Sequence, residues 1–213
     1  MTGKEPSEII VRGYSERFTK AVRHLLRIEG GYVNDPVDRG GATKYGISLR
    51  FLVSEGRFDE DADGIADFDL DMDGDIDGAD IRKLTLGDSI YLYHRCFWQR
   101  LGAESFPRPI GEALFDQAVN GGLHAARRLL QQAINAVHQR HRPGRALLEV
   151  DGRIGPRTRE AFDAMIANYG TSEMLEAFRT AVKARYHAIA ARNPDQNRFL
   201  RGWLNRADQL GNV

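Results

Sequence analysis

The sequence predicts a mainly α fold with one small β-hairpin. Apolar residues recur three or four positions apart through most of the chain, which is the spacing of helices that bury one face. Alternating strand-like patterns are nearly absent, and short runs of Gly, Pro or Asn separate the periodic segments. A length of 213 residues with 42% hydrophobic residues is enough for one buried core. We therefore expect a single domain over residues 1–213.

The first predicted helix covers residues 16–29 and starts behind Ser15, a candidate N-cap. Its apolar face consists of Phe18, Val22, Leu25 and Leu26. Gly30 and Gly31 end this helix. The following stretch, residues 32–47, is rich in Gly, Asp and Asn and is expected to form a loop or a small hairpin.

The later helices are predicted by the same periodicity. Thr85 and Asp88 have the spacing of a capping box, so a helix is expected to begin there and run toward Trp98. Cys96 is the only cysteine, which excludes an internal disulfide, and its neighbour Phe97 favours a buried thiol. Further helices are expected over residues 109–120, 122–139, 157–168, 172–192 and 195–209.

The charges are unevenly distributed, although the formal net charge is zero. Residues 59–80 hold eleven acidic residues and no Lys or Arg, so outside this segment the 30 acidic residues fall to 19, against 30 basic ones. The rest of the chain is therefore strongly basic, which suits an anionic polymer such as cell wall or nucleic acid. A solvated basic surface without a partner is the alternative.

Glu29 is the candidate acid catalyst. It falls at the C-terminal end of the first predicted helix, where the helix dipole is negative and apolar neighbours such as Leu25 and Ile28 exclude water. Both effects favour the protonated form of a carboxyl group. A glycosidic oxygen needs such a proton donor at neutral pH before its bond breaks. The alternative is an ordinary solvent-facing residue at a helix end.

Asp38 and Thr43 follow in the Gly-rich loop that could fold back over this helix end. Two carboxylates and a hydroxyl would then flank one sugar bond. Asp38 would stabilise the oxocarbenium-like charge or activate water, and Thr43 would position that water.

Two segments carry a family resemblance. Residues 29–36 read Glu-Gly-Gly-Tyr-Val-Asn-Asp-Pro, and residues 38–47 read Asp-Arg-Gly-Gly-Ala-Thr-Lys-Tyr-Gly-Ile. Together they resemble the signature of glycoside hydrolase family 108, the N-acetylmuramidases of the phage endolysin type. They also approximate the Glu, Asp, Thr spacing of phage-type lysozymes, with one residue fewer between Asp38 and Thr43.

The resemblance extends over nearly the whole chain. Its further motifs lie in residues 84–85, 90–91, 97–98, 114–116, 118–122, 130–133, 151–158 and 199–206. It implies a lysozyme-like helical fold with a catalytic half over residues 1–105 and a peptidoglycan-binding-like helical half over residues 106–213. It also implies hydrolysis of the β-1,4 bond between N-acetylmuramic acid and N-acetylglucosamine, with Glu29 as the proton donor.

Candidates for the sugar cleft are residues whose polar groups would hydrogen-bond acetamido and hydroxyl groups. They are Tyr45, Asp116, Gln117 and Asn120. For Asp116 and Asn120 the alternative is a role in pairing helices within the core. Trp203, on the last predicted helix, is expected to be core rather than a sugar platform.

The acidic segment contains an EF-hand-type calcium loop. Oxygen ligands fall at loop positions 1, 3, 5, 7, 9 and 12, with Gly74 at position 6, where the loop needs a sharp turn. The ligands are Asp69, Asp71, Asp73, Asp75, Asp77 and Asp80. Asp80 departs from the usual Glu at position 12. We expect structural Ca²⁺ here, because so many carboxylates repel one another without cations; a disordered acidic loop is the alternative.

The first half of the pattern occurs once more, ten residues earlier. It consists of Asp59, Asp61, Asp63, Gly64 and Asp67, and predicts a second calcium site or a shared two-ion cluster.

We thus expect a peptidoglycan hydrolase that acts as a monomer, without nucleic acid as a partner and without stable membrane insertion. Residues 1–15 lack a signal-peptide core. Synthesis in the bacterial cytoplasm followed by release to the cell wall is therefore expected. The alternatives are a lytic transglycosylase, which makes an anhydro sugar instead of adding water, and a non-catalytic wall-binding or secretion-accessory module.

Overall fold

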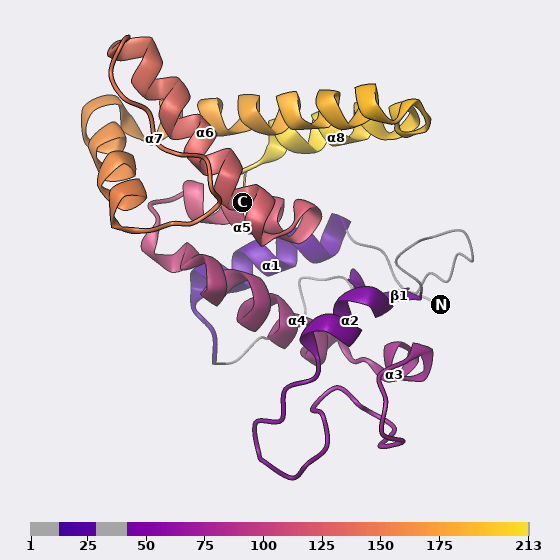
Figure 1. Cartoon of the computed structure of the whole chain (residues 1–213). Helices are drawn as coiled ribbons and strands as arrows, with labels where there is room; N and C mark the ends of the chain where they lie inside the picture. Colours follow the sequence, from indigo (N-terminus) through magenta and orange to yellow (C-terminus); the bar gives the residue numbers. More distant parts are fainter. Residues whose placement is uncertain (1–12, 29–41, 213) are drawn as a thin grey trace. The chain divides into compact units, whose positions relative to one another are not determined.

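The computed structural model describes residues 13–28 and 42–212 of the chain. The chain folds as two compact units, Met1–Cys96 and Phe97–Val213, and each is described by itself. Both are built mainly of helices, as the sequence predicts, and the N-terminal unit contains a two-stranded antiparallel hairpin (Figure 1). The division of one domain at residues 105 and 106 stays a prediction.

The first helix, α1 (Glu16–Ile28), forms where the sequence predicts it. The Oγ atom of Ser15 accepts a hydrogen bond from the Phe18 amide at 3.1 Å, which satisfies one of the free N–H groups of the first turn. Phe18 and Val22 are fully buried, and the rest of the apolar face is also buried. The predicted N-cap and the predicted core face are thus confirmed.

The hairpin pairs β1 (Thr43–Lys44) with β2 (Ile47–Ser48). Its two turn residues, Tyr45 and Gly46, have φ angles of 51° and 77°. Positive φ at both central residues is the requirement of the turn that matches the twist of a two-residue hairpin. The remainder of the predicted loop, up to residue 41, lies outside the described residues.

Two short helices of the N-terminal unit were not predicted from the sequence. Helix α2 (Leu49–Glu55) begins at the Ser48 N-cap and ends at Gly56. A Cβ atom at Gly56 would lie 2.7 Å from the Leu52 carbonyl oxygen and 2.9 Å from the Phe68 Cβ atom, so only glycine fits there. Helix α3 (Gly78–Lys83) begins inside the acidic segment with a capping box of Asp77 and Asp80.

Helix α4 (Leu86–Tyr93) begins with the predicted capping box of Thr85 and Asp88. It continues into a π-helix, η2 (His94–Gln99), in which Cys96 is buried as expected. The predicted helix toward Trp98 is therefore present, but its second half is π-helical.

The C-terminal unit is formed by long α-helices, which match the predicted ranges to within a few residues, and by three-residue 3₁₀ helices, which the sequence did not predict. They are η3 (Ala103–Ser105), α5 (Ile110–Gly121), α6 (Leu123–His141), α7 (Pro156–Arg192), η4 (Pro194–Gln196) and α8 (Asn197–Gln209). Helix α8 lies along the C-terminal part of α7 (Figure 1). None of the helices in the described part of the chain, α7 included, has an apolar stretch long enough to cross a lipid bilayer.

Helix α7 is interrupted where the sequence predicts a gap between two helices. Gly170 has φ 84° and ψ 167°, which is not helical. The start of α7 is set by Pro156, at a position where its missing N–H is not needed. Just before it, the Gly152 amide donates to Gln131 Oε1 at 2.7 Å, and Gln131 Nε2 donates to Asp151 Oδ1 at 2.8 Å. The motif over residues 151–158 thus forms a turn fixed onto α6.

Candidate functional site

Glu29 and Asp38 lie outside the described residues, and their predicted catalytic roles stay predictions. Helix α1 ends at Ile28, so Glu29 is the next residue in the sequence. The helix that precedes it is anchored by a buried apolar face that includes Leu25 and Leu26. A side chain that must be held near a helix end benefits from such an anchor, because precise placement needs rigid support.

Thr43 and Tyr45 lie on the hairpin of the N-terminal unit, and both are half-buried. The fully buried Tyr93 of α4 donates its hydroxyl hydrogen to the backbone oxygen of Tyr45 at 2.9 Å. The Lys44 ammonium group donates to the backbone oxygen of Arg82 at 2.5 Å. Helices α3 and α4 therefore hold the hairpin that carries Thr43.

The other three sugar-cleft candidates, Asp116, Gln117 and Asn120, lie on α5 in the C-terminal unit and are engaged with other helices. Asp116 Oδ1 accepts from Arg206 Nε of α8 at 3.0 Å. Asn120 Nδ2 donates to the Tyr186 hydroxyl of α7 at 2.7 Å, and that hydroxyl donates to Gln117 Oε1 at 3.1 Å.

These contacts account for the three side chains as connections between α5, α7 and α8. The Asp116 and Arg206 side chains are each only 15% exposed, and Gln117 is 1% exposed. Burial is the main cause that raises the pKa of Tyr186, so its hydroxyl keeps its proton and acts as a donor. Only Asn120 of the three is exposed. The helix-pairing alternative is supported here, and sugar contact stays a prediction.

The second half of the acidic segment, from Asp69 to Asp80, is folded around its first residue. Asp69 Oδ1 accepts from the Asp73 amide at 3.1 Å, and Asp69 Oδ2 accepts from the Gly74 amide at 2.8 Å. Gly74 has φ 98°, as the sharp turn at position 6 requires. Ile76, at position 8, is buried, and Asp80 is fully buried.

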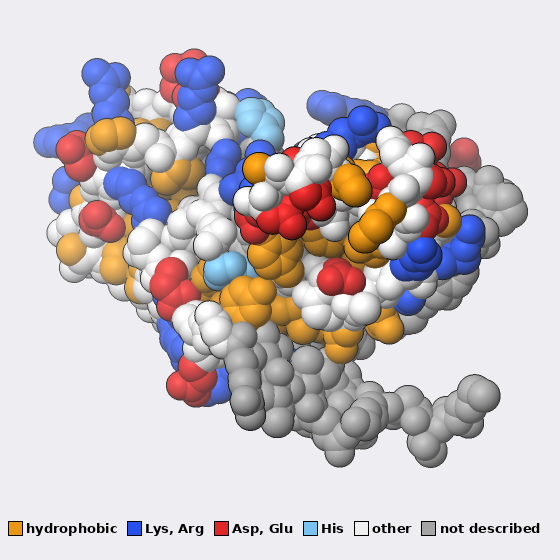
Figure 2. All heavy atoms as spheres, turned by 90° about the horizontal axis from the view of Figure 1, so that it is seen from below, with side chains coloured by type: hydrophobic (Ala, Val, Ile, Leu, Met, Phe, Trp, Pro, Cys, Tyr) orange, Lys and Arg blue, Asp and Glu red, His pale blue; other side chains and the backbone are white. Residues whose placement is uncertain are grey.

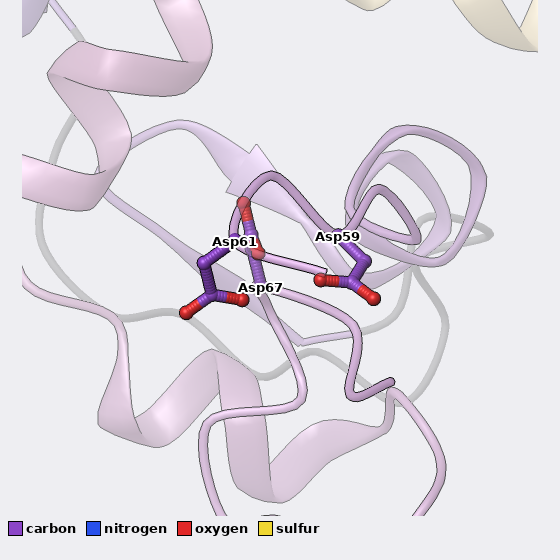
Figure 3. Close-up of side chains that lie close together, drawn as sticks. All are labelled: Asp59, Asp61 and Asp67. Carbon is purple, nitrogen blue, oxygen red and sulfur yellow. The ribbon is translucent and has the colours of Figure 1, made fainter. Parts of the chain in front are cut away.

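The first half repeats this arrangement. Asp59 accepts from the Asp63 amide at 3.2 Å and from the Gly64 amide at 2.9 Å. Gly64 has φ 90°. Oxygen atoms of Asp59, Asp61 and Asp67 lie within 4.8 Å of one another, and Figure 3 shows an oxygen of each carboxylate turned toward the other two.

The second half brings together two further groups of carboxylates. Ligand atoms within 4.8 Å of one another belong to Asp69, Asp71 and Asp73 in one group and to Asp75, Asp77 and Asp80 in the other. Acidic side chains gather in patches on the face drawn in Figure 2, with hydrophobic side chains among them. Within the described residues, backbone amides supply most of the hydrogen bonds to these carboxylates, and amides neutralise less charge than cations do.

Electrostatic strain is visible at two of these aspartates. Burial, followed by repulsion from Asp73 and Asp80, raises the pKa of Asp71. Repulsion from Asp73 is the largest cause that raises the pKa of Asp75. Asp71 Oδ1 is buried and accepts no hydrogen bond from the described residues. A set of oxygen donors with one unused buried oxygen fits a hard cation such as Ca²⁺.

Comparison with known protein families gives two matches. Residues 22–122 match the family described as Glycosyl hydrolase 108, and residues 125–208 match the family described as Predicted Peptidoglycan domain. The N-terminal part of the chain, residues 22–122, is thus similar to the glycosyl hydrolase 108 family. The glycosyl hydrolase 108 segment includes the second half of α1, the hairpin, the acidic segment and α5. The peptidoglycan domain includes nearly all of α6, all of α7 and nearly all of α8.

One solved structure shows the same fold. The structure of Brucella abortus SagA is similar over 92% of this chain and 91% of that chain, with a TM-score of 0.67 and 24% sequence identity. No curated protein matches the sequence. The match to the glycosyl hydrolase 108 family indicates a glycoside hydrolase, and the peptidoglycan domain that follows it supports peptidoglycan as the polymer that is cleaved.

Several residues that hold these sites could not be recognised from the sequence. Tyr93 lies 48 residues from the hairpin it supports, and Tyr186 and Arg206 lie 66 to 90 residues from their partners on α5. Periodicity marks all three as members of helices, but it does not say which distant side chain each one contacts.

Proposed function

We propose that this protein cleaves the β-1,4 bond between N-acetylmuramic acid and N-acetylglucosamine in peptidoglycan, by addition of water. The observation that carries the proposal is the family match over residues 22–122. That segment contains a glutamate, Glu29, directly after a helix whose apolar face is buried. The peptidoglycan domain over residues 125–208 supports the choice of polymer.

In this proposal Glu29 donates a proton to the glycosidic oxygen, which makes the sugar a better leaving group. Asp38 stabilises the positive charge that develops on the ring or activates the attacking water. Thr43 positions that water from the hairpin, which Tyr93 and Lys44 hold in place. The proposal therefore needs one protonated and one ionised carboxyl group at the same bond.

The test is Glu29→Gln, which keeps the shape of the side chain but donates no acidic proton. We expect the release of reducing ends from purified peptidoglycan to fall by a factor of about 10² to 10⁴. Glu16→Gln is the matched control, because Glu16 is an exposed glutamate at the other end of α1. Its activity should equal that of the parent. If Glu29→Gln retains the activity of the parent, Glu29 is not the acid.

Two other functions are distinguished by simple readouts. A lytic transglycosylase would release anhydro sugars from the same polymer. A non-catalytic wall-binding module would sediment with cell walls but release no sugars. The hairpin with Thr43 favours hydrolysis over both, because it offers a hydroxyl that positions water.

We also propose that the acidic segment binds Ca²⁺ as a structural ion. The ligands would be Asp69, Asp71, Asp73, Asp75, Asp77 and Asp80, and a second site would use Asp59, Asp61, Asp63 and Asp67. The unused buried oxygen of Asp71 and the repulsion at Asp71 and Asp75 support the proposal. The ion would stabilise the loop that precedes α3 and α4, which in turn hold the hairpin.

A further inference from the structure

A groove lies between α6 and α7 in the peptidoglycan domain. It has a volume of about 370 Å³ and is lined by Ala125, Arg128, Leu129, Gln132, Ala181, Ala184, Arg185, Ala188, Ile189 and Arg192. All of these residues fall within the segment that matches the peptidoglycan domain. The family description assigns a ligand to the domain but names no residues that bind it.

Three arginines give this groove its charge. Arg128 comes from α6, and Arg185 and Arg192 come from one face of α7, seven residues or two helical turns apart. No acidic side chain of the described residues lines the groove. The groove therefore presents concentrated positive charge beside an apolar floor.

The three guanidinium groups differ in the contacts they make. Arg128 Nη1 donates to the backbone oxygen of Val150 at 2.6 Å, which fixes that side chain over the groove. Arg185 is half-buried and Arg192 is exposed, and neither makes an ion pair or a side-chain hydrogen bond within the described parts of the chain. Two guanidinium forks are thus available to a ligand, and guanidinium binds carboxylates in a bidentate manner.

We propose that this groove binds the peptide stem of peptidoglycan through the free carboxylates of the stem. Seven helical residues separate Arg185 from Arg192 by about 10 Å along the axis of α7. Two carboxylates that lie two or three residues apart on an extended peptide are about 7 to 11 Å from each other, so such a pair would match the two arginines. The lining also contains small apolar side chains, which leave room for a peptide beside the arginines. They belong to Ala125, Ala181, Ala184 and Ala188.

This inference rests on the proposed function, because it takes peptidoglycan as the substrate, and it adds the part of the polymer that the domain recognises. The glycan would be held at the catalytic segment and the peptide at the groove. Recognition of the peptide would direct the enzyme to cross-linked or peptide-bearing strands in preference to bare glycan.

The first test measures binding of the full-length Glu29→Gln protein to peptide-bearing muropeptides, so that turnover does not interfere. Adding Arg185→Gln and Arg192→Gln should weaken binding at least about tenfold, since two charged hydrogen-bonding groups are lost. The matched control adds Arg142→Gln and Arg145→Gln, which make the same charge change in the exposed loop after α6. The control should bind like the Glu29→Gln protein. Equal binding by both double variants would overturn the proposal.

A second pair of variants tests the groove without a change of charge. Ala184→Phe fills the groove from the surface of α7, whereas Ala191→Phe adds the same side chain to an exposed position of α7 that does not line it. We expect Ala184→Phe to weaken binding and Ala191→Phe to leave it unchanged. Unchanged melting temperatures would show that both variants fold.

The ligand itself is varied in the last arm. Treatment of purified cell walls with an amidase removes the peptide stems. It should reduce the binding of the Glu29→Gln protein to these walls to the level of the arginine double variant. Removal of phosphate-bearing polymers from untreated walls should leave the binding of the Glu29→Gln protein unchanged. Full binding to bare glycan, or loss of binding with the phosphate polymers, would contradict the proposal. Hydrolysis is read separately as reducing ends, so failure of the proposed catalysis leaves a different result from failure of this groove.

Discussion

Two carboxylates of the acidic segment and two of the C-terminal unit are in opposite electrostatic situations. In the acidic segment, burial and neighbouring aspartates raise the pKa of Asp71, and repulsion from Asp73 first of all raises that of Asp75. In the C-terminal unit, a hydrogen bond from His141 is the largest cause that lowers the pKa of Glu173. A hydrogen bond from Gln131 is the largest cause that lowers the pKa of Asp151.

The difference shows where the chain lacks positive charge of its own. Glu173 pairs with Arg140 and His141, each at 2.8 Å, and Asp116 pairs with Arg206. In the described part of the acidic segment, Glu60 pairs with Arg95, and Asp71 is approached by Lys83 at 4.0 Å. No ion pair at all is found there for Asp73 or Asp75 among the described residues. Glu173 and Asp116 thus stabilise the fold as they stand, whereas Asp71 and Asp75 are expected to do so only with a cation.

The largest expected effect is that of calcium on the acidic segment. At a Ca²⁺ concentration about 100 times the dissociation constant, the folded state gains about 2.7 kcal/mol. For a chain of this size that gain raises the melting temperature by about 5 to 10 °C. A chelator should reverse the rise, as measured by thermal unfolding with and without EDTA.

Two variants assign the ion to one half of the segment or to both. Asp69→Asn should abolish the response of the second half of the segment to Ca²⁺. Asp59→Asn makes the same change at the equivalent position of the first half and should abolish the response of that half. Isothermal titration then counts the ions. A melting curve that does not respond to Ca²⁺ or EDTA, with no bound calcium in elemental analysis, would contradict the calcium proposal.

A slightly smaller effect is expected when the pair of Asp116 and Arg206 is broken. Asp116→Asn removes the charge that faces a guanidinium group which is 15% exposed. We expect the free energy of unfolding to fall by about 2 kcal/mol, less than for a fully buried pair because of solvent screening. Chemical denaturation measures this value. The loss should be independent of calcium, and a calcium-dependent loss would contradict the assignment of this pair to helix packing.

The contribution of Glu173 to the stability of the folded protein should be smaller. The sign of its pH dependence follows from the direction of the pKa shift. Because the pKa of Glu173 is lowered in the folded protein, its stabilising effect is present above the unfolded pKa and is lost as pH falls through the folded one. The melting temperature of the parent should therefore exceed that of Glu173→Gln above about pH 5. The difference should decrease below about pH 4. A difference that stays constant down to pH 2 would refute the role of this ion pair.

The smallest expected effect is also the one that reverses sign between the calcium-free and the calcium-bound protein. Asp75→Asn should slightly raise the melting temperature in EDTA, because it relieves the repulsion from Asp73. With Ca²⁺ present it should lower the melting temperature, because a ligand is lost. If Asp75→Asn lowers stability equally under both conditions, repulsion is not the main feature of this segment.

Helices with strong periodicity and local caps could be predicted from the sequence. Ser15 and the pair of Thr85 and Asp88 cap α1 and α4 as expected, because a cap depends on residues only three positions apart. The break at Gly170 also falls between the two helices predicted for α7. Helices α2 and α3 were missed because they are six or seven residues long and contain too few turns for periodicity to appear.

The acidic turns were predictable for the same local reason, since Asp59 and Asp69 each accept hydrogen bonds from amides four and five residues ahead. The contacts of α5 with other helices could not be predicted from the sequence. Asp116, Gln117 and Asn120 were predicted as sugar ligands from their polar groups, and their contacts with Tyr186 and Arg206 depend on how α5, α7 and α8 pack. The arginine groove likewise requires α6 and α7 to be side by side.

The central claim is that the protein adds water to the bond on the reducing side of N-acetylmuramic acid. Mass spectrometry of peptidoglycan fragments released in ¹⁸O-labelled water tests it most directly. The account predicts fragments that end in reducing N-acetylmuramic acid and carry one labelled oxygen. Fragments that end in unlabelled anhydro sugar, or in reducing N-acetylglucosamine, would contradict it.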